Sequence, residues 1–295
     1  MREMRKMRKI LALGLVAVMA IGLAACGDRP GQQKSEDTKK EDQAKTGKKG
    51  SVKNTDRNLI VGFDQNFPPF GYLDSKGNYT GFDIELAKEA AKRMNLDLEL
   101  QPIDWDAKDM ELSSGTIDCI WNGFSTNGRE GKYTFSDSYM YNAQVFVVRK
   151  DSGIKDQKGL TGKVVDVQKE SSAESALNSD EQKNLKSSFA SLNSIGDYNT
   201  AMMDLESGAV DAVAMDKFVA LDQIKNKPDK FLILDGEISS EQYAVGFLKG
   251  NKELRDKVNQ ALSAMDADGT FARISEKYFG ENVSILSKKL NAGQD

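Results

Sequence analysis

One twelve-residue pattern occurs twice in the chain, as LSSGTIDCIWNG at residues 112–123 and as LESGAVDAVAMD at residues 205–216. In both copies Leu, Ser and Gly precede an apolar residue and Asp at the same spacing. Glycine commonly stands just past the end of a helix, and the apolar run after it has the composition of a strand. The pattern therefore predicts the same helix-to-strand connection in two places, and with it two similarly built halves. Taken alone, the chance recurrence of a common α/β unit explains it equally well.

Strand and helix patterns alternate from Asn58 onward. The first half shows a strand at 58–64, a helix at 81–95, a strand at 96–103, a helix at 105–115 and a strand at 117–123. The alternation restarts near residue 162 and ends with a strand at 241–250 and helical segments at 252–279. This order predicts an α/β fold with largely parallel sheets that are covered by helices on both faces. The length of 295 residues allows two such lobes.

The N-terminal segment has a different composition. Basic residues precede an apolar run from Ile10 to Ala25 that is too short to span a bilayer, which predicts a signal peptide over 1–25. The run ends in Leu-Ala-Ala-Cys, which resembles the lipobox of bacterial lipoproteins, so Cys26 is expected to carry fatty acyl chains such as palmitate. Residues 26–57 hold almost no apolar side chains and are expected to form a flexible linker. The alternative is an ordinary secreted protein in which Cys26 is incidental.

The residue inventory excludes several kinds of site. The chain has no histidine, which removes Ser-His-Asp triads and histidine metal sites. Cys119 lies in the apolar run IDCIW and is expected to be a buried thiol, not a nucleophile. No spacing implies a metal or another cofactor. The chain has 41 basic and 45 acidic residues, of which residues 1–57 hold 14 and 7, so the remainder has a formal charge of −11 and is a poor nucleic-acid binder.

Polar residues follow the strand in each copy of the repeated pattern, Asn122 and Ser125 in the first and Asp216 in the second. Ligands of open parallel sheets bind outside the carboxyl ends of the strands, where loops and helix N-termini converge. The two strand ends are therefore expected to face a shared cleft.

Four stretches together resemble the extracellular solute-binding proteins of family 3, the polar amino-acid-binding proteins of ATP-binding-cassette importers. They are VGFDQNFPPFGYLDSKGNYTGFDIELAKEAAK, GTIDCIWNGFSTNGREGKYTFSDSYM, LTGKVVDVQKESSAESAL and VDAVAMDKFVA, in that order. The resemblance covers residues 58–279 and implies a type II periplasmic-binding-protein-like fold, with two α/β lobes, a central cleft and two hinge crossovers.

The resemblance also implies bounds for these parts. Lobe I is expected at 58–148, lobe II at 149–243, and a return to lobe I with C-terminal helices at 244–286, before a tail at 287–295. The hinges are expected around VFVVRKD, residues 145–151, and QYAVGFLKG, residues 242–250.

A zwitterionic ligand needs a cation and donors for its carboxylate and an anion for its ammonium. Arg129 matches the family's carboxylate-clamping arginine, whose guanidinium can bond both carboxylate oxygens; a solvated loop arginine is the alternative. Asp216 matches the aspartate that holds the ammonium, although it could also cap a helix. Ser171 and Ser172 begin a helix and would bind the carboxylate, although capping alone explains a serine there.

Phe67 and Trp105 match the aromatic positions that sandwich the ligand in the family, with ordinary core positions as the alternative. Asp64 ends the first strand, where relatives often place a polar group near the ligand side chain. The same side of the site is completed by Asn122, Gly123 and Ser125; at Gly123 a close approach of the backbone leaves no room for a side chain.

Two departures from the family pattern stand out. Relatives usually carry a Thr-hydrophobic-Thr run and two more residues before the arginine, whereas FSTNGR is one residue shorter, which leaves open whether Ser125 or Thr126 supplies the hydroxyl. Glu170 stands where relatives usually have glycine. Its carboxylate either turns to solvent, where its negative charge interacts favourably with the dipole of the following helix, or selects a ligand with a cationic side chain.

These expectations describe a lipid-anchored extracytoplasmic receptor that captures an amino acid, polar or basic by preference, and delivers it to the importer's permease. The expected partners are this ligand, the permease and, through the lipid anchor, the membrane; the protein is expected to be a monomer with no cofactor and no metal. The lipobox and long linker favour a Gram-positive envelope. The alternatives are a dehydratase-like enzyme on the same scaffold and a sensory or adhesive surface lipoprotein.

Overall fold

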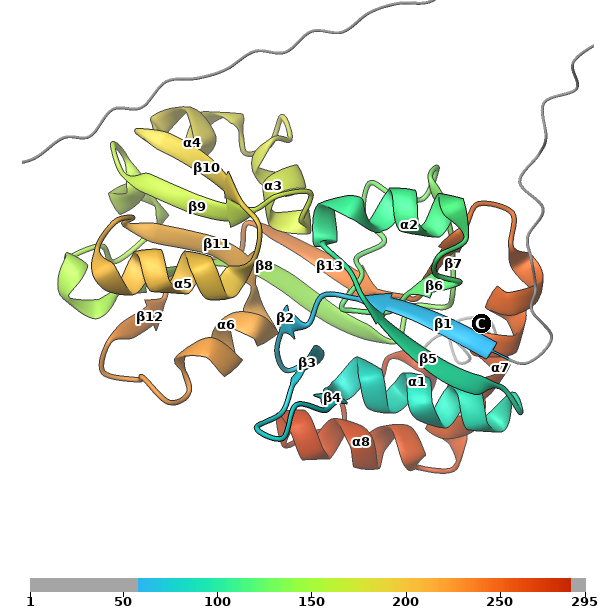
Figure 1. Cartoon of the computed structure of the whole chain (residues 1–295). Coiled ribbons are helices and arrows are strands. Elements are labelled where there is room, and N and C mark those ends of the chain that lie inside the picture. The colour runs from blue at the N-terminus through green and yellow to red at the C-terminus, as the bar shows by residue number, and fades with distance from the viewer. Residues whose placement is uncertain (1–57, 288–295) are drawn as a thin grey trace, which may run out of the picture. The chain divides into compact units, whose positions relative to one another are not determined.

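The computed structural model describes residues 58–287, which form two α/β lobes (Figure 1). The predicted signal peptide, Cys26, the linker up to residue 57 and the tail from residue 288 lie outside the described residues. Among residues 58–287, no helix combines the length and the apolar composition needed to cross a membrane. The predicted α/β fold of two lobes is confirmed, but the expectation of largely parallel sheets is wrong, because both main sheets combine parallel and antiparallel pairs.

The first lobe is built on a five-stranded sheet. Its strands, in spatial order, are β5 (Asp97–Pro102), β1 (Asn58–Phe63), β6 (Cys119–Ile120), β14 (Gly246–Leu248) and β7 (Tyr133–Phe135). β1 runs parallel to β5 and β6, whereas β14 runs antiparallel to β6 and β7. The helices of this lobe are α1 (Phe82–Arg93), α2 (Lys108–Ser114), α7 (Lys252–Ala267) and α8 (Thr270–Phe279).

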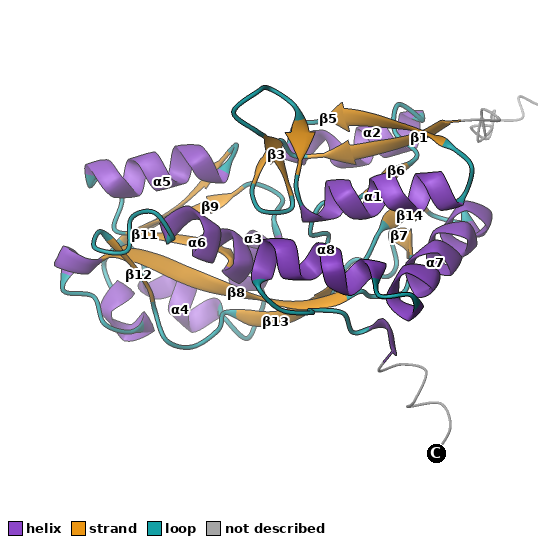
Figure 2. Cartoon of the chain, turned by 90° about the horizontal axis from the view of Figure 1, so that it is seen from below, coloured by secondary structure: helices purple, strands orange, loops and turns teal. Residues whose placement is uncertain are grey.

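The side chains of β1 alternate between the two faces of this sheet. Leu59 and Val61 pack in the core under α1, α7 and α8, whereas Ile60 packs against the core on the side of α2. Figure 2 shows α1, α7 and α8 together on one side of the strands. The sheet is therefore covered on both faces, as the sequence predicted.

A small antiparallel sheet connects β1 to α1. Its strands are β2 (Asn66–Phe67), β3 (Gly71–Leu73) and β4 (Tyr79–Thr80). The helix begins directly after Gly81, which has a φ of 134°. A Cβ atom at Gly81 would lie 2.1 Å from the carbonyl oxygen of Phe70, so only glycine allows the chain to turn here.

The second lobe is built on a six-stranded sheet (Figure 1). The order is β10 (Ser191–Ile195), β9 (Val164–Gln168), β11 (Ala212–Asp216), β8 (Met140–Arg149) and β12 (Phe231–Ile233), and β13 (Ser239–Tyr243) also pairs with β8. The helices of the second lobe are α3 (Ser172–Leu177), α4 (Lys183–Ser188), α5 (Tyr198–Ser207) and α6 (Lys217–Ile224). Short 3₁₀ turns occur in both lobes, η1 (Trp105–Ala107) in the first and η2 (Lys150–Ser152) and η3 (Gln157–Leu160) in the second.

The chain passes between the two sheets twice, through residues 136–139 and through Ala244 and Val245. The two crossings are bonded to each other, since Ser136 donates its backbone N–H to the Val245 carbonyl at 2.9 Å and Tyr139 donates to the Tyr243 carbonyl at 2.9 Å. The second expected hinge region, 242–250, contains the observed crossing.

The first hinge was expected at 145–151, and this expectation was wrong. Val145, Phe146, Val147 and Val148 are buried inside β8, between β11 on one side and β12 on the other. A continuous apolar run marks a strand buried on both faces, which is why this segment is a central strand and not a hinge. The expected lobe boundary at residue 148 falls at the end of β8, although the chain crosses at 136–139.

The repeated sequence pattern has the same structure in both lobes. Gly115 and Gly208 end α2 and α5 with φ values of 78° and 83°. The Asp118 carboxylate then accepts the Ile60 N–H at 2.8 Å, and the Asp211 carboxylate accepts the Val164 N–H at 3.0 Å. Each aspartate therefore fastens its strand to the neighbouring parallel strand, β1 in one lobe and β9 in the other.

Substitution of Gly81 is expected to be far more damaging than substitution of an open turn glycine. Gly81→Ala should lower the free energy of unfolding by at least about 3 kcal/mol, because the added Cβ meets a backbone carbonyl and the positive φ is strained. Gly77→Ala, at φ 80° with nothing within 4 Å of the added atom, should cost about 1–2 kcal/mol. Urea unfolding of both variants measures this difference; equal losses would contradict the steric account.

Candidate functional site

Arg129 reaches from the first lobe to the second. It ends a turn after β6, where its backbone N–H donates to the Thr126 carbonyl at 3.0 Å. Its guanidinium lies 4.9 Å from the centre of the Phe124 ring and donates to the Ser125 carbonyl at 3.2 Å. On the other lobe it donates to Ser172 Oγ at 2.9 Å and to the Glu170 carbonyl at 3.1 Å. The predicted pair of Arg129 and Ser172 is therefore in direct contact.

The two predicted serines have different roles in the structure. Ser171 is the N-cap of α3, and its Oγ accepts the Glu174 N–H at 3.1 Å. Its hydroxyl is therefore used for capping, the alternative that the sequence left open. The Ser172 hydroxyl instead faces Arg129 of the other lobe.

Glu170 lies at the turn before α3 with a φ of 59°, a left-handed conformation that favours glycine. Its side chain is 54% exposed, and its carboxylate lies 3.7 Å from the Lys108 ammonium. Lys108 itself is buried, lies over the Trp105 ring at 5.3 Å and donates to the Trp105 carbonyl at 3.3 Å. Burial and the nearby Arg129 charge lower the pKa of Lys108 to about 8.

Asp64 lies at the end of β1, where it is buried. Its carboxylate accepts the Asn66 N–H and the Gln168 amide of the second lobe, both at 2.8 Å. Its own N–H donates to Asn122 Oδ1 at 2.8 Å. Burial raises the pKa of Asp64, and the nearby Asp197 and Asp104 add to the effect.

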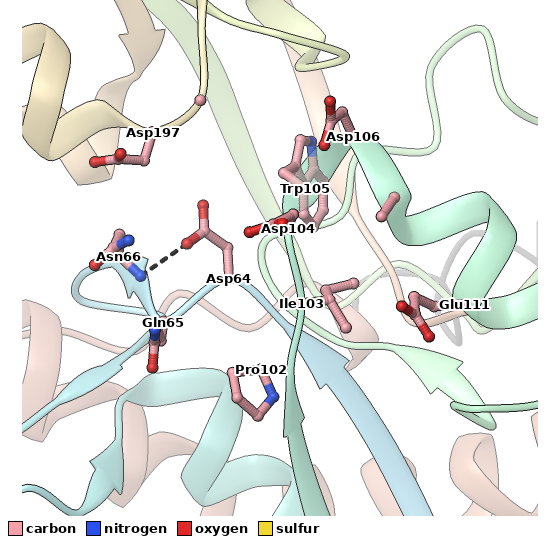
Figure 3. A pocket seen from close by; sticks show the side chains of 12 residues that line it. Asp64, Gln65, Asn66, Pro102, Ile103, Asp104, Trp105, Asp106, Glu111 and Asp197 are labelled. Carbon is pink, nitrogen blue, oxygen red and sulfur yellow. Dashed lines mark hydrogen bonds between the residues drawn. The ribbon is translucent and has the colours of Figure 1, made fainter. Parts of the chain in front are cut away.

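A cavity of about 580 Å³ lies beside Asp64 (Figure 3). Trp105 and Asn66 line it from the first lobe, and Gly196 and Asp197 line it from the second. The lining is strongly acidic, with Asp64, Asp104, Asp106, Glu111 and Asp197. Arg129 and Asp216 do not line this cavity, so the predicted site residues are not gathered around a single cavity.

Phe67 lies in β2 and is almost fully buried. Its ring centre is 5.6 Å from that of Phe70 and 6.0 Å from that of Tyr198, which belongs to α5 of the second lobe. Gly123 has a φ of 55°, and a Cβ there would lie 2.8 Å from the Phe67 ring. The close approach expected at Gly123 therefore exists, but its neighbour is an aromatic side chain of the protein.

Gly123 is held in place by a buried carboxyl group. Asp83, in the first turn of α1, accepts the Gly123 N–H at 2.6 Å and the Tyr139 hydroxyl at 2.9 Å. Asp83 is fully buried, and burial raises its pKa to about 7. The backbone after β6 is thus fixed to the helix and to the first crossing.

Asp216 ends β11 and is buried in the second lobe. Its carboxyl group accepts hydrogen bonds from Asn142 at 2.9 Å, from Gln144 at 2.8 Å and from the Tyr243 hydroxyl. Asp216 stands at the N-cap position of α6 without a side-chain capping bond. Its side chain is therefore available for a role other than capping.

Two buried polar atoms of the segment after β6 have no hydrogen-bond partner among residues 58–287, Ser125 Oγ and Asn122 Nδ2. Buried polar atoms are nearly always hydrogen-bonded, so both atoms suit contact with a polar ligand. Ser125 is almost fully buried, and this favours it over Thr126 as the source of the hydroxyl.

Sequence reasoning missed several residues in and around the site, and some of them leave a signal in the sequence. Asp83 falls on the apolar face of its helix, with Leu86, Ala87 and Ala90. Two polar pairs at alternate positions stand in apolar strands, Asn142 with Gln144 and Glu241 with Tyr243. A polar residue on a buried face needs a hydrogen-bond partner, so these positions could have been predicted from the sequence as parts of a buried polar cluster. Lys108 and Gln168 have no comparable signal.

The remaining sequence expectations concern reactive groups. Cys119 is a free, fully buried thiol, and burial raises its pKa well above the usual range. Among the described residues, no group of three or more cysteines and acidic residues could hold a metal ion.

Comparisons with known proteins match this chain along most of its length. Residues 59–281 match the family model described as bacterial extracellular solute-binding proteins, family 3. The L-cystine-binding protein TcyA of Bacillus subtilis is 34% identical over 94% of this chain and 100% of its own length. The arginine-binding extracellular protein ArtP of the same organism is 30% identical over 92% of this chain and 98% of its own.

A solved structure is similar as well. An ABC uptake transporter substrate-binding protein from Streptococcus pneumoniae, crystallised with bound histidine, has a TM-score of 0.75 and 37% identity, over 77% of this chain and 94% of its own. The type II periplasmic-binding-protein-like architecture expected from the sequence is confirmed by this likeness together with the two lobes.

The buried Asp83 predicts a pH dependence of stability. Folding raises its pKa from 3.8 to about 7. The stabilisation from its proton is therefore full below about pH 4, declines as the pH rises from 4 to 7, and is lost above about pH 7. Relative to Asp83→Asn, the wild type should lose about 2–3 kcal/mol of unfolding free energy between pH 5 and pH 8. Urea unfolding at several pH values measures this, with the exposed Asp97→Asn as control; parallel curves for wild type and Asp83→Asn would contradict it.

Proposed function

The chain belongs to family 3 of the bacterial extracellular solute-binding proteins, and on this premise we propose that it binds one amino acid between its two lobes and delivers it to an ATP-binding-cassette importer. The observation that carries the proposal is the Arg129 guanidinium, which donates to Ser125 in one lobe and to Ser172 and Glu170 in the other. A carboxylate bound there would engage a bidentate cation and both lobes at once.

The other predicted residues supply the rest of an amino-acid site. Asp216 is the partner for the ligand's ammonium, because it is a buried carboxyl group with no ion pair among the described residues. Phe67 and Tyr198 provide aromatic surface from opposite lobes, and Trp105 provides more beside the acidic cavity. Ser125 Oγ and Asn122 Nδ2 are free to bond the polar end of the ligand.

The acidic cavity favours a ligand with a positively charged group at its far end. Asp64, Asp104 and Asp197 stand close enough for the latter two to raise the pKa of Asp64, so a cation there would relieve their mutual repulsion. A basic amino acid or a long amino acid with a second ammonium group fits this charge. The names of the relatives TcyA and ArtP, which bind cystine and arginine, support both possibilities.

The remaining parts of the proposal concern the setting of the protein. The family is extracellular, and the lipobox at Cys26 supports lipid anchoring to the outer face of a Gram-positive cell membrane. The relatives are transport proteins, which supports a binding function over the dehydratase-like alternative. Neither a catalytic role nor a cofactor is part of the proposal.

Removal of the Arg129 guanidinium should abolish most amino-acid binding. Arg129→Ala should weaken binding at least about 30-fold, because loss of a hydrogen-bonded charge partner of the ligand's carboxylate costs roughly 2–5 kcal/mol. The measurement is a thermal-shift screen of the twenty amino acids with cystine and ornithine, followed by calorimetry. Arg273→Ala, an exposed arginine of α8, is the control. Equal affinities for wild type and Arg129→Ala would contradict the proposal.

Substitutions of Glu170 and Asp64 test which residue determines the preference among amino acids. The exposed Glu170 side chain faces Lys108, not the acidic cavity, so Glu170→Gly should change the order of preference among amino acids little. Asp64→Asn should lower the affinity for basic amino acids relative to neutral ones, because Asp64 lines the cavity. Competition binding with arginine and glutamine measures both variants. A reversed order in Glu170→Gly alone would assign selection to Glu170 instead.

A further inference from the structure

Asp216 shares its buried environment with a second carboxyl group that no sequence motif had marked. Glu241, on β13, is 4% exposed, as is Asp216. The two strands lie on opposite edges of β8, where Asp216 pairs with Gln144 and Glu241 pairs with Asn142. Because directly paired residues point to the same side of a sheet, both carboxyl groups and both amides share one face.

The two amides bridge the two carboxyl groups. Asn142 Nδ2 donates to Asp216 Oδ1 at 2.9 Å and to Glu241 Oε1 at 2.5 Å. Gln144 Nε2 donates to the same two oxygens at 2.8 Å and 2.7 Å. The amide oxygens of both residues, Asn142 Oδ1 and Gln144 Oε1, have no partner among residues 58–287 although both residues are buried. Two carboxyl groups are thereby held against each other, and they also share a hydrogen bond.

Among the described residues, the other hydrogen-bond donors to Asp216 are neutral hydroxyl groups. Tyr243 of β13 donates its hydroxyl to Asp216, and Tyr198 of α5 does so at 3.4 Å. Within residues 58–287 neither carboxyl group forms an ion pair; the nearest lysine in sequence, Lys217 of α6, pairs with Glu237 at 3.8 Å.

In the described part of the chain, neighbouring residues on β9 and in the first lobe add no charged group to this face. On β9 the acidic Asp166 is paired with Val213 of β11. Val213 is three residues before Asp216, an odd number, so Asp166 lies on the opposite face of the sheet. The first lobe presents Gly123 and Phe70 to the Tyr243 ring. Two adjacent buried carboxylates cannot both be ionised without a compensating cation, so one of them holds a proton.

We propose that Glu241 is a second member of the ammonium-binding site, and that the Asp216–Glu241 pair accepts the ligand by exchanging its shared proton for the ligand's ammonium group. The proton passes to solvent, and the ammonium takes its place between the two carboxylates. This inference rests on the proposed function, since it needs Asp216 to bind the ammonium.

The direction of the pH effect follows from burial. Burial, together with the charge of Glu241, raises the pKa of Asp216 to about 7. An ammonium group favours the ionised carboxylates, so binding releases a proton below this pH and the affinity falls as the pH is lowered. For the wild type, the affinity should drop about tenfold from pH 8 to pH 6, with roughly half a proton to one proton released per ligand at pH 6–7.

The experiment is calorimetric titration of the full folded chain with L-arginine, L-glutamine and L-cystine at pH 6, 7 and 8, in buffers of different ionisation enthalpy. Glu241→Gln keeps the acceptor oxygen for both amides and removes the second charge. It should bind severalfold more weakly than wild type at pH 8, and its affinity should fall less than that of the wild type between pH 8 and pH 6, with less proton release, because only burial then raises the pKa of Asp216. Glu237→Gln, at an exposed position four residues before Glu241, should behave as wild type.

The outcomes separate the two proposals. If the wild type binds none of the three amino acids, the proposed function is overturned, and proton exchange with it. If the wild type binds but releases no proton at pH 6–7, only the inference is overturned, whether or not the variant folds. Retention of the full tenfold pH dependence in Glu241→Gln would also overturn it, because Glu241 would then contribute nothing to the pH effect.

Discussion

One fully buried carboxyl group, that of Asp83, holds together the parts of the first lobe on which the site depends. It fixes the backbone of Gly123, next to the polar loop that carries Ser125 and Arg129, and it bonds Tyr139 at the first crossing between lobes. A buried carboxyl group with two specific donors tolerates little displacement, because each lost bond leaves a polar atom buried without a partner. The loop that carries Ser125 and Arg129 therefore begins at a backbone position that is fixed by a residue outside the proposed site.

The architecture could be predicted from the sequence because its signals are local. The glycines at 115 and 208 end their helices as expected, and the alternation of strand and helix gives the α/β order. The pairing order of strands depends on contacts between distant segments, and for this reason the long apolar run of β8 was taken for a hinge when it is a central strand. Periodicity shows that a strand is buried but not which strands bury it.

The candidate site was predictable only in part, for a similar reason. Arg129, Ser172 and Asp64 were identified from family resemblance, and the structure brings the first two into contact. The partners of Asp216 come from β8 and β13, segments separated by about a hundred residues, so no local pattern joins them. Glu170, by contrast, departs from the family at a position where the backbone is left-handed, and the structure gives it Lys108 as a neighbour across the lobes.

The two crossings between lobes lie side by side and are bonded to each other at Ser136 with Val245 and at Tyr139 with Tyr243. Segments joined in this way cannot bend separately, so one lobe can move relative to the other only as a rotation about a common axis. Contacts across the lobes, such as those of Arg129 with Ser172 and Gln168 with Asp64, must then break in the same movement. The residence time of a bound molecule would accordingly reflect the whole set of these contacts, since none of them can open an exit alone.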